Sequence, residues 1–471
     1  MARSWTDRFG KYLVDPRRMT HNYLLQLTLS LFVTGPCFID SFFSASTTEI
    51  ITLLNIDHSQ FSLLISIPAL TGIVSAVTAI FVSMYGSTLS AMFTGLCSFL
   101  GATITAFGLY SRNYATVMIG RFVFVLFWSL LGSFQTVIIF RQYRGPSLAW
   151  VLALQILTIR IGTAAGMYFA GPIIELSFGA VEDGFCTALI ISAISLISTF
   201  IFAYLYRGTS IARIVRPLMI GRRRNAAHVT AATHAEIPWK VYTLCVGIFF
   251  YYAGIAPFES FGVDFLTTQV GIQRDISGKM MSIVVMFSFF SPIIAPFLTS
   301  LKIQLKCTFA AQCVVAVSML LTIFQITKNP TITLACIGIG HLFCVNGLWL
   351  SLAGVSPNEH VKTEAASIGY AVNSLGTCLT SWSTGKVRDI YGNYTVAYSL
   401  LAISVMIAAT ATFAVLMANN DDDISISPPK PEKDILLTSD DENPIRSVLL
   451  PSPMLTPIIN DYFSKPISPY Q

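Results

Sequence analysis

The chain has 471 residues, of which 54% are hydrophobic and only 11% are charged. A water-soluble protein usually carries about 25% charged residues, so this composition leaves too little polar surface to cover a soluble globule. It excludes the soluble classes and predicts an all-α membrane protein that has the lipid bilayer as its main surroundings.

The N-terminal segment, residues 1–22, is basic and polar. No short apolar core with a small-residue cleavage site follows it, so we expect no cleaved signal peptide. The first apolar run, from Tyr23, is therefore expected to be a retained helix.

Twelve apolar runs follow along the chain, and most have the roughly 20 residues that a membrane-spanning helix needs. They predict twelve transmembrane helices at about 23–46, 61–84, 87–110, 116–140, 148–174, 185–206, 241–266, 280–300, 307–327, 331–355, 364–385 and 395–417. Gly162 and Gly166, four residues apart in the fifth run, predict a close helix–helix contact.

Lysine and arginine are distributed unevenly between the loops. Seventeen lie on the side that contains the N-terminus and six on the opposite side. Because cytosolic loops of membrane proteins are enriched in these residues, both termini are predicted to be cytosolic. Since the basic residues follow this topology, no nucleic-acid partner is expected.

The most basic internal segment, residues 207–240, divides the twelve runs into two sets of six. The sequence thus predicts an N-terminal half at 23–206, a basic cytosolic linker at 207–240 and a C-terminal half at 241–417. Two six-helix halves joined in this way are typical of the major facilitator fold.

The C-terminal segment, residues 418–471, is rich in proline and acidic residues and is predicted to be a disordered cytosolic tail. Within it, Glu432, Leu436 and Leu437 fit an acidic dileucine pattern, which sorting adaptors read as an address to endosomes and lysosomes. We therefore expect a lysosomal or endosomal membrane protein, with the plasma membrane as the alternative.

Arg160 lies about twelve residues into the fifth run, near the middle of the bilayer. An arginine at this depth is costly unless it faces a cavity or a partner. Its guanidinium group can hold a substrate carboxylate or phosphate through two parallel hydrogen bonds. The alternative is a structural salt bridge, but the sequence assigns no acid to the same depth.

Three other charged residues inside predicted helices are candidates for a role in the fold or in transport. Asp40 and Arg121 fall at similar depths in the first and fourth runs, so they are expected to form a structural or gating ion pair. Proton coupling through Asp40 is a secondary interpretation. Glu259 lies near the outer end of the seventh run, where it is expected to make a gate contact.

Four further residues are candidates for a central substrate pocket: His341, Trp349, Asn373 and Tyr251. His341 is near mid-depth in the tenth run, where it would either titrate or pack as a neutral imidazole. Trp349 would form an aromatic wall or simply pack between helices, and Tyr251 would face a central cavity or lipid.

The motifs of several large enzyme and ATP-binding families are missing from the sequence: GxxxxGK[ST], HExxH and GxSxG. The nine cysteines are scattered through apolar stretches and form no close pair. The sequence therefore predicts neither an enzyme nor a bound metal or cofactor.

Short stretches in order along residues 23–417 carry a resemblance to a known family, although no long block is identical. The stretches are Cys37–Asp40, Gly120–Phe124, Gln135, Leu154-Gln155, Arg160–Gly162, Tyr251-Tyr252, Pro257-Phe258, Trp349, Pro357, Glu359-His360, Gly369-Tyr370 and Leu375-Gly376. Together they resemble one branch of the major facilitator superfamily, the lysosomal dipeptide uniporters (major facilitator superfamily domain-containing protein one).

The resemblance implies a dipeptide uniporter of the lysosomal membrane, held with a heavily glycosylated accessory membrane protein. It implies that Arg160 takes the peptide carboxylate and that Trp349 lines the pocket. His341 stands where the family has a tyrosine. A second copy of the chain, in a homodimer, is a further possible partner.

The sequence departs from this branch at two places. The carboxylate of the fourth helix that would receive the peptide amine is Ser129 here, and the charged loop motif after the second helix is reduced to residues 84–87. Either Glu259 or backbone carbonyl groups take the place of this carboxylate, or the substrate is not a dipeptide.

The sequence therefore predicts a secondary transporter of a small carboxylate-bearing solute, with dipeptides as the leading candidate. One alternative is a proton-coupled organic-anion symporter in which His341 or Asp40 titrates. Another is a membrane scaffold or sensor that transports nothing, for which the tail matters and Arg160 does not.

Overall fold

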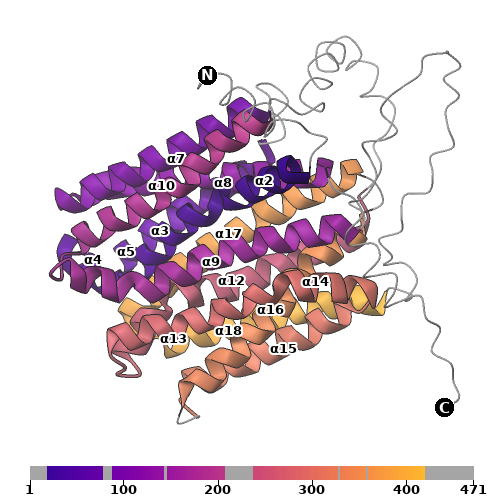
Figure 1. The fold of residues 1–471 in the computed structure, drawn as a ribbon. Coiled ribbons are helices and arrows are strands. Elements are labelled where there is room, and N and C mark those ends of the chain that lie inside the picture. The colour runs from indigo at the N-terminus through magenta and orange to yellow at the C-terminus, as the bar shows by residue number, and fades with distance from the viewer. Residues whose placement is uncertain are drawn as a thin grey trace, which may run out of the picture.

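The protein is a long bundle of helices (Figure 1). The structure, a computed structural model, describes residues 19–77, 87–142, 146–206, 237–326, 329–356 and 359–418. Most of the predicted N-terminus, most of the linker and nearly all of the tail lie outside these ranges. So do Glu432, Leu436 and Leu437, so their sorting role stays a prediction.

All elements within the described ranges are helices. We use "N-terminal half" for α2 Met19–Ser30, η1 Leu31–Val33, α3 Thr34–Ala45, α4 Thr47–Leu54, α5 His58–Ala69, η2 Leu70–Val77, α7 Ser87–Tyr110, α8 Tyr114–Gln142, α9 Pro146–Leu176 and α10 Val181–Tyr206. The "C-terminal half" comprises α12 Trp239–Thr268, α13 Arg274–Met286, η3 Phe287–Phe290, α14 Ser291–Ser300, α15 Gln304–Ile323, α16 Pro330–Gly354, α17 Glu359–Tyr391 and α18 Thr395–Met417.

Ten helical segments in the described part of the chain are long and apolar enough to cross a membrane, and they coincide with ten of the twelve predicted runs. The predicted run 61–84 is represented by α5 and η2. Together with α4, which is bent against it by 112°, it makes an eleventh candidate span. The run 364–385 lies within the 33-residue α17, which does not reach the same hydropathy.

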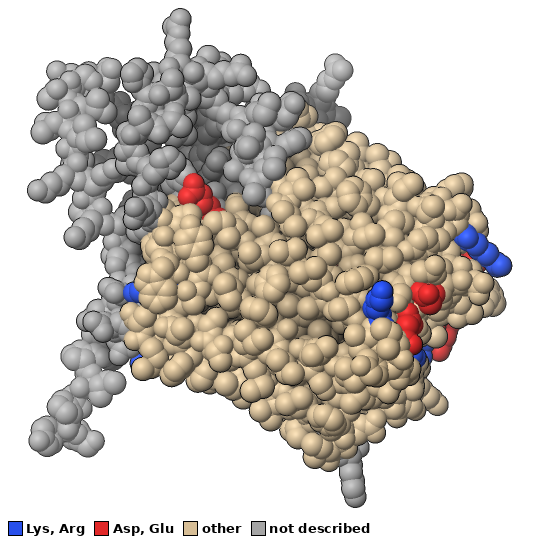
Figure 2. Space-filling model, turned by 180° about the vertical axis from the view of Figure 1, so that it is seen from behind, with Lys and Arg blue, Asp and Glu red and all other residues tan. Residues whose placement is uncertain are grey.

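The surface agrees with a membrane setting. Figure 2 shows a face on which charged side chains gather toward the ends of the bundle, with an uncharged expanse between them. Large apolar side chains of the outer helices α7, α10 and α18 are exposed, among them Phe107, Ile190 and Met406. Lipid, rather than water, is the solvent that such a surface fits.

The two halves repeat the same set of helix contacts. In the N-terminal half α3 packs on α9, α7 on α8, and α10 on α7. In the C-terminal half α12 packs on α17, α15 on α16, and α18 on α15. The halves meet where α17 crosses α5 and η2, and where α9 crosses α13 and α14. Such internal repeats place the site of a transporter at the interface between them.

The close contact predicted for Gly162 and Gly166 is confirmed. A Cβ atom on Gly162 would lie 2.2 Å from the carbonyl oxygen of Thr34, and one on Gly166 would lie 2.4 Å from that of Phe38. Only glycine lets α9 approach the backbone of α3 this closely. The contact fixes the position of α9, and hence of Arg160, next to the first helix.

Candidate functional site

An ion pair between the two halves lies at the centre of the candidate site. The Nη1 atom of Arg160, on α9, is 3.3 Å from Oε1 and 3.2 Å from Oε2 of Glu259, on α12. The side chain of Arg160 is 11% exposed and that of Glu259 is 14% exposed. The structure thus supplies the acid at the depth of Arg160 that could not be assigned from the sequence.

The sequence predicted a gate contact for Glu259 near the outer end of its helix, and that role stays a prediction. In the structure the carboxylate of Glu259 pairs with Arg160, which lies halfway along α9. The outer position on α12 is taken by Asp264, five residues further along the helix. The salt bridge that was the alternative interpretation of Arg160 is therefore present.

His341 and Tyr251 form a second pair beside the first. The Tyr251 hydroxyl lies 2.7 Å from Nδ1 of His341, and both side chains are fully buried. The other ring nitrogen of His341, Nε2, lies 3.6 Å from Oε1 of Glu259. Tyr251 therefore faces the interior rather than lipid, and it orients the imidazole toward Glu259.

Aromatic side chains from the C-terminal half form one wall. Trp349 Nε1 donates a hydrogen bond of 3.1 Å to the Tyr252 hydroxyl. The rings of Trp349 and Tyr370 lie 4.7 Å apart. The Tyr370 hydroxyl in turn lies 3.0 Å from Oγ1 of Thr136 in the N-terminal half. This second contact between the halves was not predicted.

A chain of amides continues from Thr136 into the N-terminal half. Gln155 donates hydrogen bonds to Thr136 at 3.0 Å and to Gln135 at 3.2 Å, and Gln135 donates to the Leu29 carbonyl oxygen at 2.9 Å. The sequence offered one signal for these residues, since Gln135 and Gln155 are polar residues inside apolar runs.

Two other positions singled out in the sequence lie on helices next to the site. Asn373 is half-buried on α17, one turn after Tyr370, where its amide oxygen lies 3.5 Å from the Thr377 hydroxyl. Ser129 is half-buried on α8, one turn before Ser133. Neither makes one of the contacts that join Arg160, Glu259 and His341.

Asp40 and Arg121 contact each other within the N-terminal half, 2.7 Å apart. Arg121 is 2% exposed and lies over the rings of Phe43 and Phe124. Because α3 and α8 both belong to the N-terminal half, the pair ties two helices of one half together. This position favours the structural interpretation over a gate.

A second polar group joins the halves at the end of the bundle where α4 and α13 lie in Figure 1. We call it the end cluster. Its members are Thr48, Glu49, His58, Asp264, Arg274 and Asp389. His58 of the N-terminal half lies 3.4 Å from Asp264 of α12 and 3.4 Å from Asp389 of α17.

Further hydrogen bonds and an ion pair connect the members of the end cluster. Thr48 donates a 3.0 Å hydrogen bond to Asp264, and Glu49 pairs with Arg274 across the halves. Tyr394 also donates to Asp264, at 2.5 Å. Burial and the neighbouring Asp264 carboxylate raise the pKa of Tyr394, so its hydroxyl stays protonated and able to donate.

The end cluster yields a testable prediction. Asp264→Asn removes the charge that holds His58 and should favour a state open at this end. Losing about 1.4 kcal/mol of hydrogen bonding changes the ratio of open to closed states about tenfold. Thr163 is half-buried on α9, one turn beyond Arg160. A cysteine at this position, in a background without other reactive thiols, should then react about tenfold faster with a polar maleimide.

Asp183→Asn is the matched control. Asp183 accepts a hydrogen bond from Tyr110 at the same end, but both residues belong to the N-terminal half. It should leave the rate of labelling unchanged. Equal rates in the Asp264→Asn variant and the wild type would show that the end cluster does not hold the halves together.

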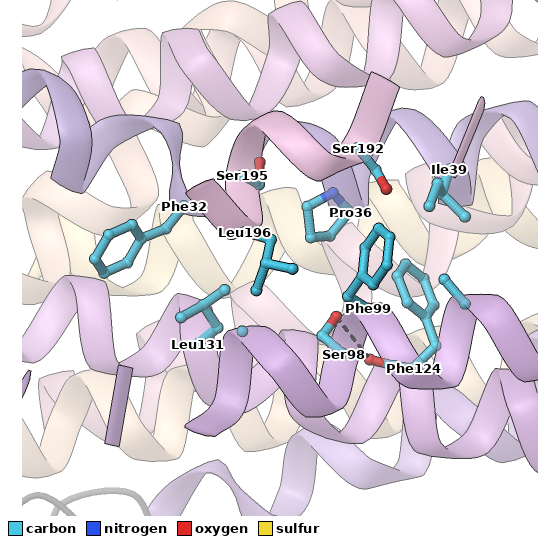
Figure 3. Close-up of a pocket in the computed structure, with 12 residues that line it drawn as sticks. Phe32, Pro36, Ile39, Ser98, Phe99, Phe124, Leu131, Ser192, Ser195 and Leu196 are labelled. Atoms are coloured by element: carbon cyan, nitrogen blue, oxygen red, sulfur yellow. Dashed lines mark hydrogen bonds between the residues drawn. The ribbon is translucent and has the colours of Figure 1, made fainter. Parts of the chain in front are cut away.

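A small cavity lies elsewhere, inside the N-terminal half (Figure 3). Phe32, Pro36 and Leu131 line it, together with Ser98 and Ser195. Ser98 donates to the Phe124 carbonyl oxygen, and Ser195 donates to that of Leu31. Because these hydroxyls already bond backbone groups, the cavity reads as a packing gap between helices and not as a solute site.

No protein-family model matches the chain. Among curated proteins, it is 24% identical over 394 residues to the lysosomal dipeptide transporter MFSD1 of Homo sapiens. It is 22% identical over 393 residues to the protein of that name in Danio rerio. Each alignment covers 81% of this chain and 83% of the relative.

Solved structures show the same fold. The xylose transporter XylE of E. coli, in a partially occluded inward-open conformation, matches with a TM-score of 0.64 at 12% identity, covering 83% of this chain and 98% of that chain. The E. coli fucose:proton symporter FucP matches with a TM-score of 0.55 at 12% identity, covering 84% and 98%. Both are described as major facilitator superfamily transporters. The relatives named here are transporters and not enzymes.

Proposed function

We propose that the chain is a divergent member of the major facilitator superfamily and that it moves a small carboxylate-bearing solute across a membrane by alternating access. Dipeptides are the leading substrate class. The relatives of similar length carry the name of lysosomal dipeptide transporter, which supports both the substrate and a lysosomal or endosomal membrane. The plasma membrane is the alternative location.

The observation that carries the proposal is the Arg160–Glu259 pair between the halves. A guanidinium group offers paired donors that match a carboxylate. A carboxylate next to it offers an acceptor for an ammonium group. A dipeptide brings both groups, so it can take over both partners of the existing ion pair without leaving a charge alone in the interior.

In this proposal Glu259 takes the role of the fourth-helix carboxylate of the resembled branch, at whose position this chain has Ser129. The amine of the peptide would bind an acid of α12 in the C-terminal half instead of one of α8 in the N-terminal half. Since Arg160 holds the other end of the peptide from the N-terminal half, the solute itself would then connect the two halves. Trp349, Tyr252 and Tyr370 would contact its side chains, with Asn373 at the edge.

Transport requires that the halves part at one end at a time. The end cluster would serve as one gate, because its contacts run from α4 and α5 to α12, α13 and α17. When those contacts break, the central site opens toward that end. On the topology predicted from Lys and Arg, this end faces the lumen.

The test is thermal stabilisation of the purified protein by matched ligands. A ligand that binds only the folded state raises the melting temperature. A free dipeptide is expected to raise it, whereas the same dipeptide with a C-terminal amide, which lacks the carboxylate, should raise it far less. Stabilisation only by organic anions would point to the anion-symporter alternative, and equal effects of the two peptides would reject a carboxylate site.

A further inference from the structure

The central site balances its own charge. Arg160 and Glu259 carry one positive and one negative charge, and His341 beside them is fully buried. A net charge in such a poorly hydrated place costs far more than in water. The pair is therefore neutral as a unit, and a bound solute must preserve that neutrality.

We infer that this charge balance sets the proton requirement of the transporter. A zwitterionic solute binds without a proton. A solute that carries only a carboxylate binds together with one proton, which Glu259 takes up. The inference rests on the proposed function, since it assumes that the solute carboxylate binds Arg160.

The charge of the solute decides whether a proton is taken up when it binds. The solute carboxylate replaces that of Glu259 at the guanidinium group of Arg160. A zwitterion then offers its ammonium group to Glu259, and no proton is exchanged with water. A monoanion offers no cation, so one proton leaves the solvent and forms an O–H bond on Glu259. No electron transfer or other covalent change is involved.

The His341–Tyr251 pair suits both states of Glu259. A neutral imidazole has one N–H group and one acceptor nitrogen, and a tyrosine hydroxyl can donate or accept. If Tyr251 donates to Nδ1, then Nε2 carries hydrogen and faces an ionised Glu259. If Nδ1 donates to Tyr251, then Nε2 accepts the proton of a neutral Glu259.

The position of Nε2 supports this role. It is buried, and no hydrogen-bond partner for it lies within the described ranges while Glu259 is held by Arg160. Its distance of 3.6 Å from Oε1 of Glu259 is slightly too long for a hydrogen bond. A small shift of the carboxylate away from Arg160 would complete the bond.

The other ionisable groups around Glu259 leave it as the proton acceptor. Asp40 of α3 is held by Arg121, and the charged residues of α13 lie at its first turns. α18 brings Tyr398, which packs against the ring of Phe258 and faces Asp264. The groups that face Glu259 are Arg160 from α9, His341 from α16, and Tyr251 and Tyr252 from α12 itself. Two more groups lie one step further away: Tyr370 of α17 lies behind Tyr252, and Cys37 of α3 lies behind Arg160.

The experiment compares the affinities of two ligands for the intact purified protein between pH 5 and pH 7. One is a free dipeptide, which is a zwitterion throughout this range. The other is the same dipeptide with an acetylated amine, which is a monoanion. The affinity of the acetylated peptide should rise about tenfold for each unit that the pH falls, because one proton binds with it. The affinity of the free peptide should stay constant.

Glu259→Gln gives a second arm, because its amide is neutral at every pH. In this variant the acetylated peptide should bind with the same affinity across the range, and the free peptide should bind at least tenfold more weakly. Equal pH dependence of the two peptides in the wild type would overturn the inference. Binding of the free peptide alone would also overturn it while leaving the proposed function intact. If neither peptide binds at any pH, both fall.

Discussion

Replacing Arg160 with lysine or alanine is expected to reduce uptake of the carboxylate solute into proteoliposomes by about 100-fold. The guanidinium group can donate two aligned hydrogen bonds to a carboxylate, whereas lysine offers a single flexible ammonium group. Hydrogen bonds to charged groups contribute about 1.5–3 kcal/mol, and about 2.7 kcal/mol corresponds to 100-fold in affinity. Initial uptake rates with labelled dipeptide provide the measurement.

The controls separate a lost binding group from a misfolded protein. Arg160→Lys keeps the positive charge beside Glu259, so it should fold better than Arg160→Ala. The double change Arg160→Ala with Glu259→Ala removes both charges and should recover stability but not uptake. Uptake by Arg160→Ala within twofold of the wild type would exclude Arg160 as the carboxylate anchor. If deletion of residues 418–471 then abolished the cellular function, the scaffold interpretation would be preferred.

The membrane class and most helix positions could be predicted because lipid imposes them directly. A segment that crosses the hydrocarbon core must be long, apolar and helical, and these demands are visible in hydropathy. The exception is instructive. α17 packs against α5, η2, α12 and α18, so protein surrounds much of it. It can therefore carry polar residues such as Asn373 and Thr384 that lower its hydropathy.

The partner of Arg160 could not be predicted because a sequence gives the depth of a residue only coarsely. Each residue advances a helix by about 1.5 Å, so a count along α9 and α12 places Arg160 and Glu259 several residues apart. Both side chains are long enough to span that difference. Which way each helix is turned depends on packing, here on Gly162 and Gly166 against α3.

The end cluster was missed for a different reason. His58, Asp264 and Asp389 are more than a hundred positions apart in the chain, and His58 meets the two acids only because the two halves fold against each other. The one local signal was Asp264, an acid inside the seventh apolar run. An acid in such a run needs a partner, but nothing in the sequence identifies His58 as that partner.

The two transport mechanisms left open by the sequence need not exclude each other. If the central site preserves its charge, then the same residues would carry a dipeptide without a proton and an organic anion with one. The choice would lie in the charge of the solute. A separate proton-binding residue would then not be needed. Asp40 would be left with a structural role in its pair with Arg121.

Asp40→Ala is expected to destabilise the protein by about 3 kcal/mol, because removing one partner of a buried ion pair leaves the other charge uncompensated. Arg121 is 2% exposed and holds Asp40 at 2.7 Å, while its Nη1 atom lacks a hydrogen-bond partner among the described residues. Its other contacts among the described residues are a 3.5 Å hydrogen bond to the Leu64 carbonyl oxygen and the rings of Phe43 and Phe124. Reversible unfolding in mixed micelles with increasing SDS measures the difference.

Two further variants decide what the pair is for. Asp40→Asn keeps an acceptor for Arg121 and should be less destabilising, whereas Asp40→Ala combined with Arg121→Met removes both charges and should regain much of the lost stability. A purely structural pair predicts that the double variant still transports and keeps the pH dependence of the wild type. If Asp40→Ala folds as stably as the wild type but loses the pH dependence of anion uptake, Asp40 and not Glu259 carries the proton. The group that takes up the proton with an anionic solute would then belong to the Asp40–Arg121 pair between α3 and α8, and not to the central site.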